Sequence, residues 1–361
     1  MLATWRRAGL LPSNVRGPAA AGGRGTTSAT PPEALTLVLW LSDHARPGRR
    51  PTDVALEAFA AGLPIPEATI RDAWLSTATS LALPETPPEV SAEAREGWVA
   101  EVADAAVARE SHHPVLLPRR IRDLDARVAA VGFSWAAPEI AAFDKGPGTD
   151  EPFTRRDYVH LTVSAVLGGT AQFDDIDLAG YARALAPAGA AVPVASMLEH
   201  PDDNPALAEI HDGNSLTLLP AGDIRKALAG LINEASLSQL RAAWKAVEDL
   251  HEWAESLCAN AEHELDLLAA GVIRDAWPGI QAWCIGSLLG ANRSLLIAGL
   301  RDPAPTSSAR AHLAVTLLFI TTALNRLRIL VPGGQFELLP DLLPPFLTRL
   351  TELIADPRAP T

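Results

Sequence analysis

The chain has 361 residues, of which 48% are hydrophobic and 20% are charged. This composition excludes an intrinsically disordered chain, and the length allows two or three domains of ordinary size. The two cysteines, Cys258 and Cys284, are too few for a disulfide framework, and the sequence has no Cys-x-x-Cys pair that could bind zinc. We interpret both as small buried residues of a cytoplasmic protein.

The net charge of −13 is unevenly distributed along the chain. The first 50 residues contain seven arginines and only two acidic residues, a net charge of +5, so the remaining residues carry −18. A basic end on an acidic body indicates a short segment that faces an anionic partner. No membrane partner is predicted, because the most apolar segment, 311–324, is shorter than the roughly 20 residues that a spanning helix needs.

Apolar residues repeat almost everywhere at helical spacing, so the predicted fold class is all-α, with a small N-terminal winged-helix-like remnant followed by a larger helical bundle. In the first third of the chain, helices are expected over 2–11, 31–44, 54–61, 66–83 and 90–110. Further helices are expected over 118–131, 151–168, 175–186, 221–233, 236–269, 276–300, 306–329 and 340–355. Prolines near 84–88 and 114–118 divide the chain into an N-terminal module (1–83), a linker helix and hinge (84–117) and a helical domain (118–361).

One predicted helix carries an unbroken apolar seam with alternating spacings of three and four residues. The seam consists of Leu237, Leu240, Trp244, Val247, His251, Ala254, Cys258, Ala261, Leu265 and Leu268. This spacing keeps one stripe of a helix against a partner helix. The partner belongs either to the same chain, which gives a helical bundle, or to a second copy, which gives a homodimer. We favour the bundle, because several apolar helices downstream need to be buried.

The N-terminal residues combine a basic helix with a glycine-rich segment. Thr4–Pro12 (TWRRAGLLP) ends in Gly-Leu-Leu-Pro, Val15–Thr27 is basic and contains several glycines, and Pro31–Glu33 is an acidic helix start. This order resembles the end of the recognition helix, the wing and the next helix of MerR-type winged helix-turn-helix transcriptional regulators. Arg49–Ala55 resembles the start of that family's later helix. The resemblance covers under a quarter of the chain, and the first helix of the motif, which would precede Leu2, is absent.

The resemblance implies that the partner is double-stranded DNA and that Arg6, Arg7, Arg16 and Arg24 contact it. A helix with adjacent arginines can lie in the major groove, and a glycine-rich arm lets the other two approach phosphates or the minor groove. The planar guanidinium group can donate two hydrogen bonds to a phosphate or to guanine. Trp5 is expected to pack this helix against the wing.

The first hypothesis is therefore a DNA-binding transcriptional regulator whose helical domain binds a small-molecule effector or a partner and sets the geometry of a dimer. Because the motif lacks its first helix, either the chain begins downstream of the true start or this copy has lost DNA binding. The alternative is a non-enzymatic helical ligand-binding or protein-interaction protein with a vestigial DNA-binding head.

No catalytic residue, cofactor or metal site is predicted, since the sequence has no P-loop, Gly-x-Ser-x-Gly or Rossmann glycine motif. Glu248 and His251 have the Glu-x-x-His spacing of di-iron bundles, but His251 lies on the apolar seam, where a polar residue fixes helix register. Asp174–Asp177 resembles the aspartate-rich Mg²⁺ motif of terpene synthases, although a solvated helix start is favoured. These two segments define a third hypothesis, a metal-dependent helical enzyme.

Overall fold

A computed structural model describes most of the chain, and its helices and one hairpin account for the regular structure in that part. The described residues are 2–18, 26–29, 31–32, 34–78, 83–84, 91–109, 117–133, 141–142, 144–148, 152–168, 175–200, 223–274, 278–288, 290–302, 305–330 and 343–355. Apart from a two-stranded antiparallel hairpin, all elements of this part of the chain are helices, which confirms the predicted all-α class.

The elements fall into three groups along the chain. The head, residues 2–78, contains α1 (Leu2–Arg7), β1 (Val15–Pro18), β2 (Thr26–Ala29), α2 (Ala34–His44), α3 (Pro51–Ala60) and α4 (Glu67–Ala78). A middle group contains α5 (Ala92–Arg109), α6 (Arg119–Ala130), α8 (Arg155–Gly168), α9 (Asp175–Leu185) and α10 (Pro193–Glu199). The last group contains α12 (Ile224–Glu234), α13 (Leu237–Ala269), α14 (Pro278–Leu288), α15 (Gly290–Arg301), α16 (Ser307–Leu330) and α18 (Pro345–Ala355).

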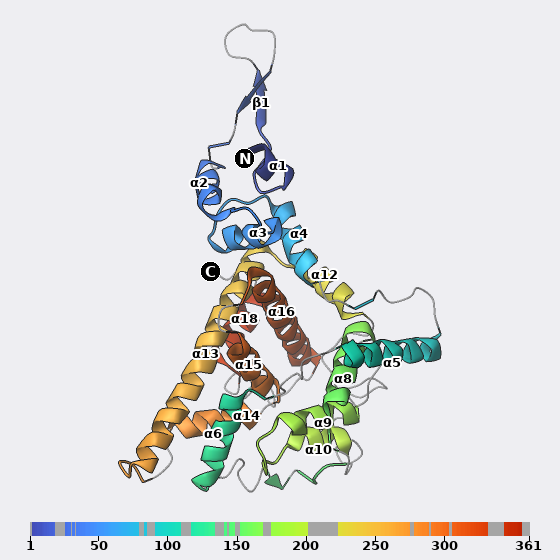
Figure 1. Cartoon of the computed structure of the whole chain (residues 1–361), viewed down its shortest axis with the longest axis vertical. Coiled ribbons are helices and arrows are strands. Elements are labelled where there is room, and N and C mark those ends of the chain that lie inside the picture. Colours follow the sequence, from blue (N-terminus) through green and yellow to red (C-terminus); the bar gives the residue numbers. More distant parts are fainter. Residues whose placement is uncertain are drawn as a thin grey trace.

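Figure 1 shows the head at one end of the molecule, with the hairpin projecting beyond α1. We call all helices from α5 onward the body. The long helix α13 runs along one side of the body from the head to α6 and α14, and α5, α8, α9 and α10 lie on the other side. Helices α15, α16 and α18 occupy the space between these two sides.

Two elements differ from the sequence-based expectation. The helix expected over 2–11 ends at Arg7, because Gly9 adopts a positive φ of 71°. The helix expected over 276–300 corresponds to α14 and α15, and residue 289 between them lies outside the described residues. Helix α10 was not expected, although Pro193 at its first position suits a helix start.

The 33-residue helix α13 has clear signals at both ends. The Ser236 side chain accepts a hydrogen bond from the Gln239 backbone N–H, and the Gln239 side chain accepts one from the Ser236 N–H, which is a capping box. At the other end, Gly271 adopts a positive φ of 69°, and its N–H donates to the Leu268 carbonyl. With a rise of 1.5 Å per residue, the helix is about 50 Å long.

The seam of α13 packs inside its own chain. Leu237, His251 and Leu268 are half-buried, and the buried seam residues are Leu240, Trp244, Val247, Ala254, Cys258, Ala261 and Leu265. Helices α6, α14, α15, α16 and α18 of the same chain pack against α13. The bundle interpretation of the seam is therefore confirmed.

The head has no hydrophobic core of its own in the described structure. One buried cluster contains residues of α1–α4 together with residues of α12, α16, α18 and the first half of α13. A second cluster is formed by α6, α14, α15 and the second half of α13. The division of the chain near residue 83 stays a prediction, but the two sides of that boundary share one continuous apolar interior.

A series of edge-to-face aromatic contacts crosses the junction between head and body. Phe59 of α3 meets Trp74 of α4 edge to face at 6.3 Å between ring centroids, and Trp74 meets Trp244 of α13 in the same way at 6.1 Å. The Arg241 guanidinium lies 4.8 Å above the Phe59 ring, and that of Arg310 lies 4.7 Å above the Trp244 ring. Edge-to-face aromatic pairs contribute about 0.5–1.5 kcal/mol beyond the burial of their area.

Helix α12 has an arginine contact at each end, one to the head and one to residues 83 and 84. At its C-terminal end, Arg71 Nη1 from α4 donates to the carbonyl oxygens of Ile232 at 2.7 Å, Ala235 at 3.1 Å and Asn233 at 3.2 Å. At its N-terminal end, the Arg225 side chain donates to the carbonyl oxygens of residues 83 and 84, just beyond α4. A cation at a helix C-terminus satisfies carbonyls that have no partner within the helix.

A buried ion pair links α6 to α15. Arg293 is 1% exposed, and its guanidinium donates to the Asp125 carboxylate and, at 2.9 Å, to the Leu185 carbonyl oxygen. Trp283 Nε1 donates to the same carboxylate at 3.1 Å. Burial raises the pKa of Asp125, and the hydrogen bonds from Arg293 and Trp283 oppose that effect. A buried charge pair of this kind is sensitive to the loss of either partner.

Helix α16 is long and apolar enough, by length and composition, to cross a membrane, and among the described residues it is the one helix of that kind. Residues Ala311, Ala314, Val315, Leu317 and Leu318 are nevertheless fully buried in the cluster shared by head and body. The interpretation of 311–324 as part of a buried core helix agrees with this packing. A cytoplasmic location stays a prediction.

Candidate nucleic-acid interface

Helix α1 ends in a turn that the sequence Thr-Trp-Arg-Arg-Ala-Gly-Leu specifies locally. Gly9 adopts a φ of 71°, its N–H donates to the Arg6 carbonyl at 3.0 Å, and the Leu10 N–H donates to the Trp5 carbonyl at 2.9 Å. This pair of bonds is a Schellman motif, in which a hydrophobic contact joins the residues at its two ends. Trp5 and Leu10 are 7% and 2% exposed, so they anchor the short helix to the core.

Helix α4 holds this turn in place. The Thr69 hydroxyl donates to the Gly9 carbonyl at 2.8 Å. A Cβ atom at position 9 would lie 2.6 Å from Thr69 Oγ1, so both the positive φ and the close approach require glycine. Because α4 also carries Arg71, the turn after α1 and the attachment of α12 are built on one helix.

The four arginines predicted to contact DNA have different placements. Arg7 is exposed on α1, whereas Arg6 is half-buried and lines a pocket of about 460 Å³ between the turn after α1 and the start of α4. Arg16 lies on β1 opposite Ser28 of β2, and Arg24 lies outside the described residues. The structure thus shows the exposure of Arg7 and the backbone position of Arg16.

The hairpin extends from the same end of the molecule as α1 (Figure 1). Its strands are antiparallel, with Val15 opposite Ala29 and Pro18 opposite Thr26.

Further cations lie in the loop between α2 and α3, where Arg46, Arg49 and Arg50 are exposed. Arg49 forms an ion pair with Glu57 of α3, and Ser307 of α16 donates to the same carboxylate at 2.7 Å. Burial alone would raise the pKa of Glu57, but these hydrogen bonds outweigh it and lower the pKa. These three arginines contribute to the net charge of +5 of the first 50 residues, but no motif in the sequence assigned them to the interface.

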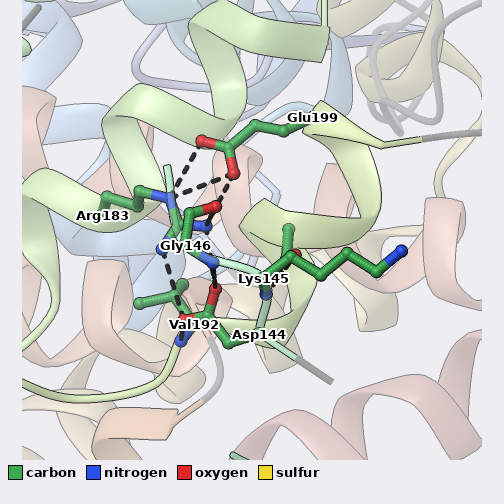
Figure 2. Close-up of polar contacts among 7 residues, drawn as sticks. Asp144, Lys145, Gly146, Arg183, Val192 and Glu199 are labelled. Carbon is green, nitrogen blue, oxygen red and sulfur yellow. Dashed lines mark hydrogen bonds and ion pairs between the residues drawn. The ribbon is translucent and has the colours of Figure 1, made fainter. Parts of the chain in front are cut away.

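A second polar cluster, in the body, joins the 144–148 loop to α9 and α10 (Figure 2). Arg183 donates to Glu199 Oε2 at 2.6 Å, to the Gly146 carbonyl at 2.8 Å and to Asp144 Oδ1 at 3.0 Å. Asp144 Oδ2 also accepts from the Val192 N–H at 2.6 Å. Burial would raise the pKa of Asp144, but these donors lower it. Because the guanidinium and both carboxylates have partners within the cluster, we interpret the cluster as structural: it joins the loop to α9 and α10.

Neither segment of the metal-enzyme hypothesis forms a cluster of metal-ligating side chains among the described residues. Glu248 forms an ion pair with Arg310, which lowers the pKa of its carboxyl group. His251 Nδ1 lies 2.6 Å from the Gly299 carbonyl, which can only accept, so Nδ1 carries the proton and donates. Asp174 lies outside the described residues, and the rest contain no group of three or more metal-ligating side chains.

Comparison of the chain with protein families, with curated proteins and with solved structures found no match.

Proposed function

We propose that the protein is a DNA-binding transcriptional regulator, with an N-terminal head that contacts double-stranded DNA and a helical body that acts as a sensor or dimerisation unit. The observation that carries this proposal is the joint projection of α1 and the hairpin from one end of an acidic body, with Arg7 exposed. The proposed contacts are Arg7 and Arg6 on α1, Arg16 on the hairpin, and Arg24 between the two strands.

The charge distribution supports an orientation in which the head faces DNA and the body faces away from it. The first 50 residues carry +5 and the remaining residues carry −18. A field of this kind repels the body from the DNA backbone and turns the head toward it. Each phosphate contact releases condensed counterions, so binding through these arginines depends steeply on salt concentration.

The attachment of the head supports a regulatory role. Because α12 is held at both ends by arginine contacts to α4 or the residues just beyond it, a shift of α12 is transmitted directly to the helix that positions α1. The body can therefore bias the geometry of the head through direct contacts. A homodimer would use a surface other than the α13 seam, which is buried within the chain.

The test is fluorescence anisotropy of mixed genomic duplex fragments at several salt concentrations. The Arg7→Ala variant should weaken binding and reduce the slope of log Kd against log salt by about one, the value for one lost phosphate contact. The matched control is Arg274→Ala, which removes the same charge from an exposed residue just beyond α13, far from the head, and should leave the slope unchanged. Binding that is undetectable at low salt, or equal slopes for both variants, would overturn the proposal.

The alternative, a helical ligand-binding protein with a vestigial head, is favoured by one observation, a small cavity between α8, α9 and α15. Ligand binding to the full chain without any binding to duplex DNA at low salt would support this alternative over the regulator.

A further inference from the structure

The body contains a cavity of about 170 Å³ between α8, α9 and α15. Its lining combines aromatic, aliphatic and polar side chains: Tyr158, Tyr181, Leu185, Ser294, Ile297, Ala298 and Arg301. An engineered apolar cavity of about 150 Å³ accommodates one benzene molecule. The space is thus matched to a single six-membered ring with one small substituent.

Aromatic side chains form and hold one wall of the cavity. Tyr158 of α8 and Tyr181 of α9 stack with 5.8 Å between ring centroids and 27° between ring planes. Phe153 packs against the same Tyr181 ring at 6.1 Å. A Cβ atom at Gly180 would lie 2.9 Å from the Phe153 ring, so glycine is needed for Phe153 to reach this position. The Tyr181 ring is therefore held between two aromatic neighbours.

Polar groups gather at the same cavity. The Tyr181 hydroxyl forms a hydrogen bond with Ser294, and the positive charge of Arg301 acts on this hydroxyl. Burial raises the pKa of Tyr181 above its usual value of 10.0. A tyrosine hydroxyl is protonated at neutral pH even without this shift, so it can donate a hydrogen bond. Arg301 ends α15 and is exposed, which places a guanidinium at the rim rather than inside. A cavity lined by hydroxyl donors and a cation suits an anionic oxygen ligand.

We propose that this cavity binds a small aromatic carboxylate, with the ring against Tyr158, Leu185 and Ile297 and the carboxylate toward the Tyr181 hydroxyl and Arg301. The aliphatic and tyrosine surfaces bury the ring, and the hydroxyl and guanidinium donors select the carboxylate. This inference deepens the proposed regulator, because it gives its sensor a location and a ligand class. Its binding test uses the chain without DNA, so that its failure is separable from failure of the DNA-binding proposal.

The cavity is connected to the head by direct helix contacts. Helix α8, which carries Tyr158, packs against α12, and α12 packs against α4. A ligand that orders Tyr158 acts on α8 and hence on α12, the helix that Arg71 attaches to the head. If the ligand changes the affinity for DNA, DNA must change the affinity for the ligand by the same factor.

The test is isothermal titration calorimetry of the full chain with sodium benzoate, with sodium acetate and benzyl alcohol as probes that lack the ring or the charge. Benzoate should bind saturably with one ligand per chain, and each of the other two probes should bind at least about tenfold more weakly, benzyl alcohol because it loses the charged contact and acetate because it buries no ring. Equal binding of acetate would reveal only a general anion site and would overturn the assignment. An absence of saturable benzoate binding would overturn it as well.

Two variants locate the site. Ala298→Leu fills the cavity and should abolish benzoate binding, and Arg301→Gln should raise the benzoate Kd about tenfold while leaving benzyl alcohol binding unchanged. Arg274→Ala is the matched control for charge, and its benzoate affinity should equal that of the wild type. The urea midpoint of each variant shows whether it folds. Arg301 is exposed, so the comparison of benzoate and benzyl alcohol binding by Arg301→Gln does not depend on a substitution in the core. Wild-type benzoate affinity in both folded variants would place the ligand elsewhere and refute the proposal.

Discussion

Arg71→Ala tests whether the head is attached to the body through the C-terminal end of α12. In the structure, one guanidinium nitrogen of Arg71 lies 2.7–3.2 Å from three carbonyl oxygens of that helix end. A hydrogen bond to a charged group contributes about 1.5–3 kcal/mol. Because a single nitrogen serves all three oxygens, we count them as one strong bond with two weaker alternatives.

The charge of Arg71 at a helix C-terminus adds about 0.3–1 kcal/mol, so the combined range is about 1.8–4 kcal/mol, and the partial exposure of the side chain (23%) places the expected value in the lower half of this range. We expect Arg71→Ala to lower the free energy of unfolding by about 2–3 kcal/mol. The measurement is equilibrium unfolding in urea, followed by circular dichroism and by tryptophan fluorescence. Coincident transitions from the two probes justify a two-state analysis.

Arg119→Ala is the matched control for this experiment. Arg119 forms an ion pair with Asp123 one turn along the same helix at 3.4 Å, and its side chain is 86% exposed. Exposed pairs of this kind contribute up to about 0.5 kcal/mol, so the control should be close to the wild type. If Arg71→Ala also falls within about 0.5 kcal/mol of the wild type, the contacts to α12 do not stabilise the junction and the reasoning fails.

Three further substitutions probe separate features. Gly9→Ala should cost about 1–3 kcal/mol in urea unfolding, because alanine is strained at a φ of 71° and its Cβ would meet Thr69; an unchanged midpoint would contradict this. Arg293→Met should cost about 3–5 kcal/mol in thermal denaturation, since it leaves the Asp125 carboxylate buried without its charge partner, and wild-type stability would refute that role. Burial lowers the pKa of His312 below 6.5, so the folded state binds fewer protons and stability should decrease as the pH falls below about 6.5. His312→Gln should lose less stability than the wild type between about pH 7.5 and 5.5, and an equal loss would exclude His312 as the cause.

Periodicity predicted most of the helices, because an amphipathic stripe can be recognised without knowing what covers it. The seam of α13 is the clearest case: its spacing predicted which side chains are buried, but the identity of the covering helices depends on the rest of the fold. Helix α10 was missed because seven residues are too few to show a period.

The candidate interface was predictable in part. Composition alone located the basic end, but the helix expected over 2–11 ends earlier, at Arg7, where the positive φ of Gly9 forms the turn. The attachment by Arg71 was not predictable, since its acceptors are backbone carbonyls about 160 positions away that carry no sequence signal. The cavity at Tyr181 was missed because its lining joins α8 and α9 to α15, which follows more than 100 positions later in the chain.

Both apolar clusters contain residues of the single continuous helix α13, and this restricts how the length of α13 can change in evolution or in design. Its first half contributes to the cluster beneath the head, and its second half contributes to the cluster around α14 and α15. Inserting one residue at the midpoint rotates one half by about 100° relative to the other and turns one buried stripe toward solvent. Inserting seven residues restores the angle to within about 20°, so changes in length are expected to be tolerated only in whole heptads.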